Sequence, residues 1–188
     1  MFRSTVLRRT PGLAAGLIVL VALLAPASAQ AQGCANVDVT PTRGNLEVVR
    51  SAVLCLHNAE RARHGLPRLS ESARLRRAAE RHSTHMVGAH FFDHTSPSGA
   101  TMLVRIRRTG YMSGARGWSL GENIAWGSGW LATAAEIQRG WMKSPGHRAN
   151  ILKRSFRQIG IGIETGLPVR LSASQAGATY TTDFGYRR

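Results

Sequence analysis

Three side chains in the sequence, His94, Glu122 and His147, are of the types that bind a divalent metal ion. Two neutral imidazoles and one carboxylate form the ligand set of known catalytic zinc sites, in which water takes the remaining position. A metal held in this way lowers the pKa of its bound water toward about 7, which could drive hydrolysis. The three residues are therefore candidate metal ligands and candidate catalytic residues, provided that the fold brings them together. Zinc or another divalent cation is the expected cofactor, and no organic cofactor is indicated.

A break in a helix determines where His147 lies. Pro145 and Gly146 interrupt the segment that runs from Gly140 to Leu152. A helix interior rejects proline, because its ring clashes with the carbonyl four residues back and its N–H is missing. We therefore expect one helix to end at this dipeptide and the next segment to begin with His147, at a junction where side chains tend to face a cleft.

Ser144 offers a second chemistry that needs no metal. A serine near His147, with Glu122 as the orienting group, would form a triad-like set for nucleophilic catalysis. The structural alternative is that Ser144 caps the segment that contains His147, which is a common role for serine at a helix start. We favour the capping role.

Other histidines precede this set without forming a recognised metal motif. His82, His85, His90 and His94 follow one another closely, but no glutamate intervenes as in the H-E-x-x-H motif, so a zinc peptidase of that type is rejected. We interpret the first three as solvated or capping side chains. His57 lies within a predicted helix and is interpreted as structural.

Several short motifs, in this order along the chain, resemble the CAP superfamily (cysteine-rich secretory proteins, antigen 5 and pathogenesis-related 1 proteins), and specifically its short bacterial branch. The resemblance extends from His57 to Gly185. It is carried by the segments around His94, Glu122 and His147, by the Trp141 helix, by Gly65-Leu66-Pro67-Arg68-Leu69 and by Ile159-Gly160-Ile161-Gly162-Ile163. It implies an α+β domain, a three-layer α-β-α sandwich with a small antiparallel sheet. It also implies a surface cleft in which the two histidines hold a divalent metal, with acidic residues in contact directly or through water.

The resemblance departs from the family pattern at one acidic position. Larger CAP proteins carry a second acidic residue just past the tryptophan that corresponds to Trp141, and Ser144 stands at the matching position here. Glu136 lies upstream of Trp141 and completes a capping box with Thr133. We therefore expect Glu136 to cap the helix and only secondarily to replace the missing acid. Ser144, Glu136 and Asn123 are the further candidates for lining the cleft.

Two cysteines, Cys34 and Cys55, lie beyond an apparent secretory signal. Residues 1–29 combine an arginine-rich start, an apolar run from Leu13 to Leu24 and the small residues Ala27-Ser28-Ala29. That run is shorter than the roughly 20 residues of a membrane span. Cleavage after Ala31 is an alternative. We predict a protein exported by a Sec-type signal, with an arm over residues 30–44 and the domain over residues 45–188.

In an oxidising compartment a Cys34–Cys55 disulfide is expected, the alternative being a buried Cys55 thiol.

The chain is strongly basic, with 25 Lys and Arg against 10 Asp and Glu and a formal net charge of +15. Such a protein is attracted to anionic surfaces, although a compositional bias toward arginine explains the charge equally well. A lysine-rich run, an aromatic stacking series and a helix-turn-helix pattern are all missing from the sequence, so a specific nucleic-acid partner is not indicated. We expect a monomer.

Periodicity places the elements that must position these residues. Helices are predicted over residues 46–64, capped by Asn45, over residues 70–86, capped by Ser70, over residues 100–109, and onward from Thr133. Strands are predicted over residues 157–164 and 178–184, with a further short strand over residues 169–173. The glycines that alternate with isoleucine between Ile159 and Ile163 suggest that another backbone approaches closely.

Three functions remain open on these observations. The first, which we favour, is a secreted binding module whose cleft engages an envelope, lipid or polysaccharide ligand and is tuned by metal. The second is a metal-assisted hydrolase, a peptidase or cell-wall hydrolase. The third is a structural scaffold. The missing second acid favours the first and third, because a hydrolase needs a general base.

Overall fold

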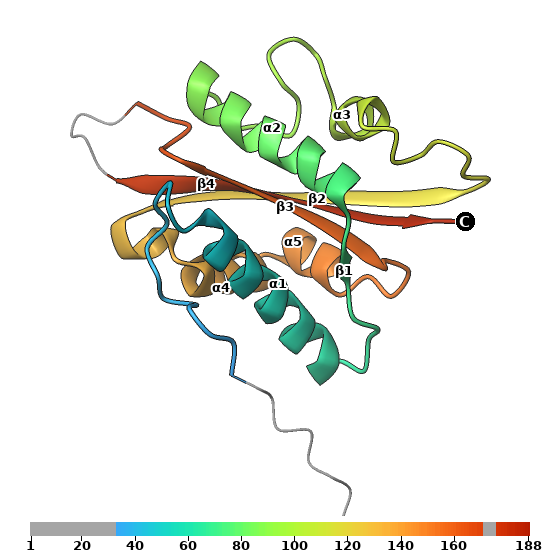
Figure 1. Cartoon of the computed structure of the whole chain (residues 1–188), viewed down its shortest axis with the longest axis horizontal. Coiled ribbons are helices and arrows are strands. Elements are labelled where there is room, and N and C mark those ends of the chain that lie inside the picture. The colour runs from blue at the N-terminus through green and yellow to red at the C-terminus, as the bar shows by residue number, and fades with distance from the viewer. Residues whose placement is uncertain (1–32, 171–175) are drawn as a thin grey trace, which may run out of the picture. The chain divides into compact units, whose positions relative to one another are not determined.

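The computed structural model describes residues 33–170 and 176–188, which belong to one unit of the chain, Ala31–Arg188 (Figure 1). The expected signal segment, residues 1–29, lies outside the described residues. The elements are α1 (Leu46–Arg63), β1 (Ser70–Glu71), α2 (Ala73–Ala89), α3 (Met102–Arg108), β2 (Trp118–Ser128), the 3-10 helix η1 (Gly129–Ala132), α4 (Ala134–Lys143), α5 (Pro145–Ile151), β3 (Gln158–Thr165) and β4 (Gly177–Arg187).

A sheet of four strands in the order β1-β3-β4-β2 forms the middle layer. Helices α2 and α3 lie on one face of the sheet, and α1, α4 and α5 lie on the other (Figure 1). The predicted α+β class and the three-layer arrangement are therefore confirmed. The sheet is mixed and not purely antiparallel, because the two-residue strand β1 pairs in parallel with β3. Strand β2 pairs with β4 along its full length and forms one edge of the sheet.

The alternating glycines of β3 let α2 pack directly on the sheet. A Cβ added at Gly160 would overlap the backbone of Arg76, and one added at Gly162 would overlap the backbone of Ala79. The isoleucines between these glycines are buried on the opposite face, in the core formed with α1 and α4. The close backbone approach expected from the sequence is thus present, and α2 is its source.

An aromatic cluster fills the core on the side of α1 and α4. The His57 ring lies 5.5 Å from Trp141, edge to face, and 5.7 Å from Phe184, nearly parallel. His57 is fully buried, and this burial lowers its pKa to about 3, so the ring is neutral. This histidine is a packing residue.

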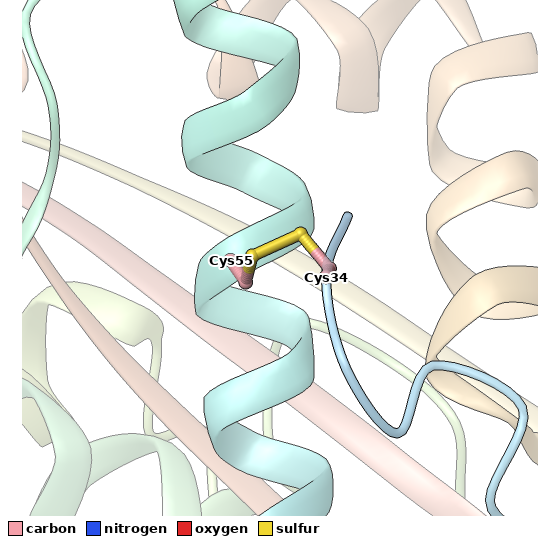
Figure 2. Close-up of a disulfide and its surroundings, with 2 residues drawn as sticks. All are labelled: Cys34 and Cys55. Atoms are coloured by element: carbon pink, nitrogen blue, oxygen red, sulfur yellow. A yellow bond between two sulfur atoms is a disulfide. The ribbon is translucent and has the colours of Figure 1, made fainter. Parts of the chain in front are cut away.

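A disulfide joins Cys34 to Cys55, with an S–S distance of 2.07 Å and a separation of 21 residues (Figure 2). It fastens the segment that precedes α1 to the middle of that helix. The predicted disulfide is therefore confirmed, and the alternative of a buried Cys55 thiol is excluded.

Two helix starts differ from the sequence-based expectation. Ser72 caps α2 through a bond from the Leu75 amide, because Ser70 is occupied as the first residue of β1. Asn45 stands at the start of α1, but its side chain bonds to Thr42 N and Thr40 O in the preceding turn and does not cap the helix.

The expected short strand over residues 169–173 lies mostly outside the described residues, and the two residues that are described, Val169 and Arg170, are not in a strand. Among the helices of the described part, none is both long and apolar enough to span a bilayer.

Candidate metal and ligand site

Glu122 lies in the middle of β2 and bonds to residues from two other segments. His94 Nδ1 lies 2.9 Å from Glu122 Oε1, and Arg105 Nη2 donates to Glu122 Oε2 at 2.5 Å. The Glu122 side chain is 2% exposed, whereas the His94 side chain is 53% exposed. A buried carboxylate therefore holds an imidazole whose other edge is open to solvent. The structure thus brings together two of the three residues singled out in the sequence.

Each partner shifts the pKa of the other. The hydrogen bond to Glu122 raises the pKa of His94, although partial burial opposes it. Burial pushes the pKa of Glu122 upward, but the bond from His94 and the charge of Arg105 together outweigh burial and hold that pKa below its usual value. Glu122 is therefore ionised at neutral pH. An ionised carboxylate only accepts hydrogen bonds, so His94 Nδ1 carries the proton in this contact.

Arg105 of α3 holds the loop that carries His94. Its Nη1 donates to the backbone oxygens of His94 at 2.9 Å and of Ala100 at 2.8 Å, and its side chain is 8% exposed. His82 of α2 supports the same loop, with its Nε2 3.0 Å from Asp93 O. The histidine is thus fixed through both its ring and its backbone.

His147 is the third residue of α5, a helix that opens with Pro145 at a position where proline is tolerated. The expected break is present, but Pro145 and Gly146 belong to the new helix and do not separate it from His147. Asn123 Nδ2 donates to His147 O at 3.1 Å, and Asn150 Nδ2 donates to Asn123 Oδ1 at 2.9 Å. The half-buried imidazole has a lowered pKa because of burial, and then because of positive charge on His94. His147 is therefore neutral at pH 7.

A cavity of about 660 Å³ opens beside His147, between β2 and α4. Its walls are mainly apolar, with Phe92, Ile124, Trp126, Leu131, Ile137 and Trp141 among the lining residues. The volume falls within the range of pockets that hold a small molecule. Trp141 Nε1 donates to Ile124 O of β2 at 3.1 Å, and this bond fastens α4 beside the cavity.

The three further cleft candidates occupy different places. Ser144 and Glu136 lie on the cavity wall, whereas Asn123 is fully buried and supports the backbone of His147. Thr133 accepts from the Glu136 amide as predicted, but the Glu136 carboxylate pairs with Arg139 instead of completing the capping box. None of these contacts directs the Glu136 carboxylate toward a metal ion.

The expected roles of Ser144 are not visible in its contacts. Ser144 stands between α4 and α5, but its side chain makes no capping bond at the start of α5. Within the described part of the chain, no hydrogen bond links its hydroxyl to His147, so a triad is not assembled in this conformation.

His94 and His147 are the two imidazoles that could hold a metal ion here, and Glu122 supports His94 alone. Metal-bound histidines commonly donate their second ring N–H to a carboxylate, as His94 does to Glu122. This leaves His94 Nε2 and neutral His147 as available nitrogen donors. Both oxygens of Glu122 are already engaged, and within residues 33–170 and 176–188 no three His, Cys, Asp or Glu side chains are arranged to hold a metal ion.

Sequence reasoning missed two buried residues beside Glu122. Arg105 is one arginine among many in a basic chain, and only its 8% exposed side chain distinguishes it. Asp183 of β4 lies directly across from Glu122 in the sheet register and is fully buried. Burial, followed by the negative charge of Glu122, raises the pKa of Asp183 well above its usual value. The alternation of strand 178–184 could have placed Asp183, but nothing in the sequence indicated that its neighbour would be Glu122.

The fold agrees with a family match over residues 54–168, to the cysteine-rich secretory protein (CAP) family. The chain belongs to the CAP family. It is 33% identical over 143 residues to the uncharacterized protein YkwD of Bacillus subtilis, a match that covers 76% of this chain and 51% of that protein. It is 29% identical over 112 residues to the uncharacterized membrane protein YlbC of the same organism, covering 60% of this chain and 30% of YlbC. The chain thus spans about half or less of the length of these curated relatives.

Solved structures show the same fold. An extracellular SCP-domain protein of Bacillus anthracis superposes with a TM-score of 0.55 at 27% identity, covering 74% of this chain and 43% of that one. An outer surface protein of Borrelia burgdorferi gives a TM-score of 0.55 at 17% identity, covering 79% of this chain and 96% of that one. The extracellular relative and the disulfide together suggest secretion.

Proposed function

We propose that this protein is a secreted binding module whose apolar cavity beside His147 engages a ligand of the cell envelope or the extracellular space. The observation that carries the proposal is the cavity itself: about 660 Å³, bordered by β2 and α4, with one imidazole at its wall. Apolar walls with a few polar groups are typical of sites that bind lipid-like or other partly apolar ligands. Export would follow from the signal segment expected over residues 1–29.

We further propose that a divalent cation tunes this cleft. His94 Nε2 and a nitrogen of His147 would hold the ion, and Glu122 would orient His94 without binding the metal directly. When bound, the ion would offer an open coordination position to an electron-rich group of the ligand. The influence of His94 charge on the pKa of His147 supports the proximity of the two rings.

The alternative function, a metal-assisted peptidase or cell-wall hydrolase, has less support. Such an enzyme needs a general base close to the reacting water. Glu122 is occupied by His94 and Arg105, and Glu136 is paired with Arg139. Neither carboxylate is therefore free in this conformation to accept a proton.

A variant that fills the cavity tests the proposal. Gly140 lines the cavity, and a Cβ added there meets no atom within 4 Å, so Gly140→Leu adds an apolar side chain at the cavity wall on α4 without a clash at its Cβ. We expect the wild-type protein to be retained saturably on isolated envelope fractions in high salt, and Gly140→Leu to lose at least tenfold in apparent affinity.

Gly88→Leu is the matched control, because Gly88 lies on α2, outside the cavity, with equally open space around it. Equal retention of both variants would contradict the cavity as the binding site. Retention that disappears entirely in high salt would reduce binding to the net charge of the chain. Turnover of a peptide or wall-polymer library that stops with EDTA and returns with zinc would favour the hydrolase instead.

A further inference from the structure

A second cavity, of about 240 Å³, lies between α2, the loop before α3 and α3 itself. Its polar lining consists of Arg81 and His85 from α2, Ser96 and Ser98 from the loop, and Arg105 and Arg108 from α3, and two alanines complete the wall. Arg81 and His85 are separated by one helical turn, so their side chains share a face of α2. Two helices thus present cationic side chains to one small space.

The charge of this second cavity is not balanced by the protein. Arg105 is neutralised by Glu122, but no acidic side chain lies among the lining residues. In the part of the chain that the structure describes, Arg81 and Arg108 take part in no ion pair and no side-chain hydrogen bond. Two exposed guanidinium groups therefore retain their full set of donors and their positive charge.

Two further polar groups of the lining residues, the Ser96 hydroxyl and Arg105 Nε, have no hydrogen-bond partner in the described part of the chain. Ser96 is 4% exposed and is held by its backbone, whose amide donates to Ala100 O at 3.0 Å and whose carbonyl accepts from Gly99 N at 2.8 Å. Its hydroxyl makes no hydrogen bond to any described residue. Arg105 Nε is likewise buried without a hydrogen-bond partner in the described chain. The Ser96 hydroxyl is therefore available to donate to a ligand in the cavity, whereas Arg105 Nε lacks the accessible surface to reach one.

We propose that this second cavity binds the phosphate group of a phosphomonoester. Guanidinium groups match phosphate oxygens in geometry and form charge-assisted hydrogen bonds with them, and serine hydroxyls add neutral donors. The volume is below the roughly 300 Å³ at which pockets enclose a whole drug-sized ligand, so the site takes the anionic group and leaves the rest of the ligand outside. A soluble phosphate ester and the headgroup of a phosphatidic-acid lipid share this chemistry.

Calorimetric titration with inorganic phosphate tests the site. The protein without residues 1–29 is used, and chloride keeps the ionic strength constant. We expect saturable binding that weakens at least tenfold in the double variant Arg81→Gln/Arg108→Gln. The matched control is Arg77→Gln/Arg107→Gln, which removes the same charge from exposed positions of the same two helices, outside this cavity. Equal weakening in both double variants, or no saturable binding by wild type, would overturn the proposal.

Vesicle sedimentation separates the two sources of phosphate. Retention on phosphatidylcholine vesicles that contain phosphatidic acid, lost in Arg81→Gln/Arg108→Gln but kept in Arg77→Gln/Arg107→Gln, would assign the lipid headgroup. Phosphate binding with the same dependence on the variants, but without vesicle retention, would assign a soluble phosphate ester. Vesicle retention that is equal in both double variants would show attraction by net charge and contradict a built site.

Discussion

Glu122 is shared between a half-exposed imidazole and a buried guanidinium, and this sharing defines the chemistry of His94. The carboxylate favours a charged His94 through the 2.9 Å bond to Nδ1, while Arg105 keeps the carboxylate ionised. The sequence motifs predicted that His94 and Glu122 belong together. They could not predict Arg105, because an arginine in a short basic helix looks the same whether its side chain is exposed or buried.

The variant Glu122→Gln tests this assignment at His94. The amide retains the shape of the carboxylate but not its charge, so we expect the pKa of His94 to fall from its raised value to about 6.5 or below. Titration of the His94 ring by NMR measures this directly. Glu136→Gln, which removes a charge from the cavity wall, should leave the His94 pKa unchanged, and an equal response to both substitutions would contradict the pairing.

Asp183 provides a second prediction, in the pH dependence of stability. Its pKa is raised in the folded state by burial and by Glu122, so the folded protein binds a proton that the unfolded chain releases above about pH 3.9. Because the folded state must keep this proton bound, the unfolding free energy falls as the pH rises from about 4 toward the folded pKa. Asp183→Asn removes that cost.

We therefore expect the unfolding free energy of Asp183→Asn, relative to wild type, to increase between about pH 4 and pH 7 with a slope of up to about 1.4 kcal/mol per pH unit. Urea unfolding at several pH values measures the difference. Parallel stability curves for the two proteins would show that Asp183 ionises normally in the folded state.

At the scale of the elements, the packing of α2 on β3 could be predicted from the sequence. The role of Arg61, which holds the end of α5 in place, could not. Glycines that alternate with isoleucines indicate both a strand and a close neighbour. By contrast, Arg61 is fully buried and donates to four backbone oxygens, those of Pro67, Ile151, Lys153 and Phe156. It fixes the end of α5 and hence the helix that carries His147. Helical periodicity places Arg61 on the same face of α1 as Val53 and His57, but it does not indicate that a charged side chain there is buried and bonded to backbone oxygens.

The glycine contact leads to a matched pair of substitutions. Gly162→Ala places a methyl group against the α2 backbone, and overpacking of this kind should lower the unfolding free energy by about 2 kcal/mol or more. Gly88→Ala adds the same methyl group on α2 in open space and should be neutral or stabilising by about 0.5–1 kcal/mol. Denaturant unfolding compares the two, and equal effects would argue against close packing of α2 on β3.

At the scale of the whole molecule, the cysteine pair and the family motifs determined most of what the sequence could establish. Two thiols beyond an expected signal segment predicted the disulfide, and the order of the motifs predicted the three layers. The cleft at His147 was expected, but the apolar lining of the first cavity and the whole of the second were not predictable, because their walls combine residues from segments far apart in the chain, such as Phe92 with His147 and Arg81 with Arg108.

Removal of the disulfide should weaken the whole domain. The Cys34–Cys55 bridge closes a loop of 21 residues, which in the chain-entropy model stabilises by roughly 3 kcal/mol. We expect Cys34→Ser/Cys55→Ser to lower the unfolding free energy by about that amount, as measured by denaturant titration. A reducing agent should destabilise wild type and leave the double variant unchanged. Equal sensitivity of both proteins to the reductant would contradict the bridge.

The central claim, that His94 and His147 from distant segments form one metal-tuned site, is tested most directly by calorimetric titration with zinc at about pH 7.5, where both imidazoles can bind as neutral ligands. We predict that the protein binds about one equivalent, and that His94→Ala and His147→Ala each abolish the binding. His64→Ala, at a histidine outside both cavities, should retain it. Zinc binding that persists unchanged in both His94→Ala and His147→Ala, or its absence in wild type, would contradict the account.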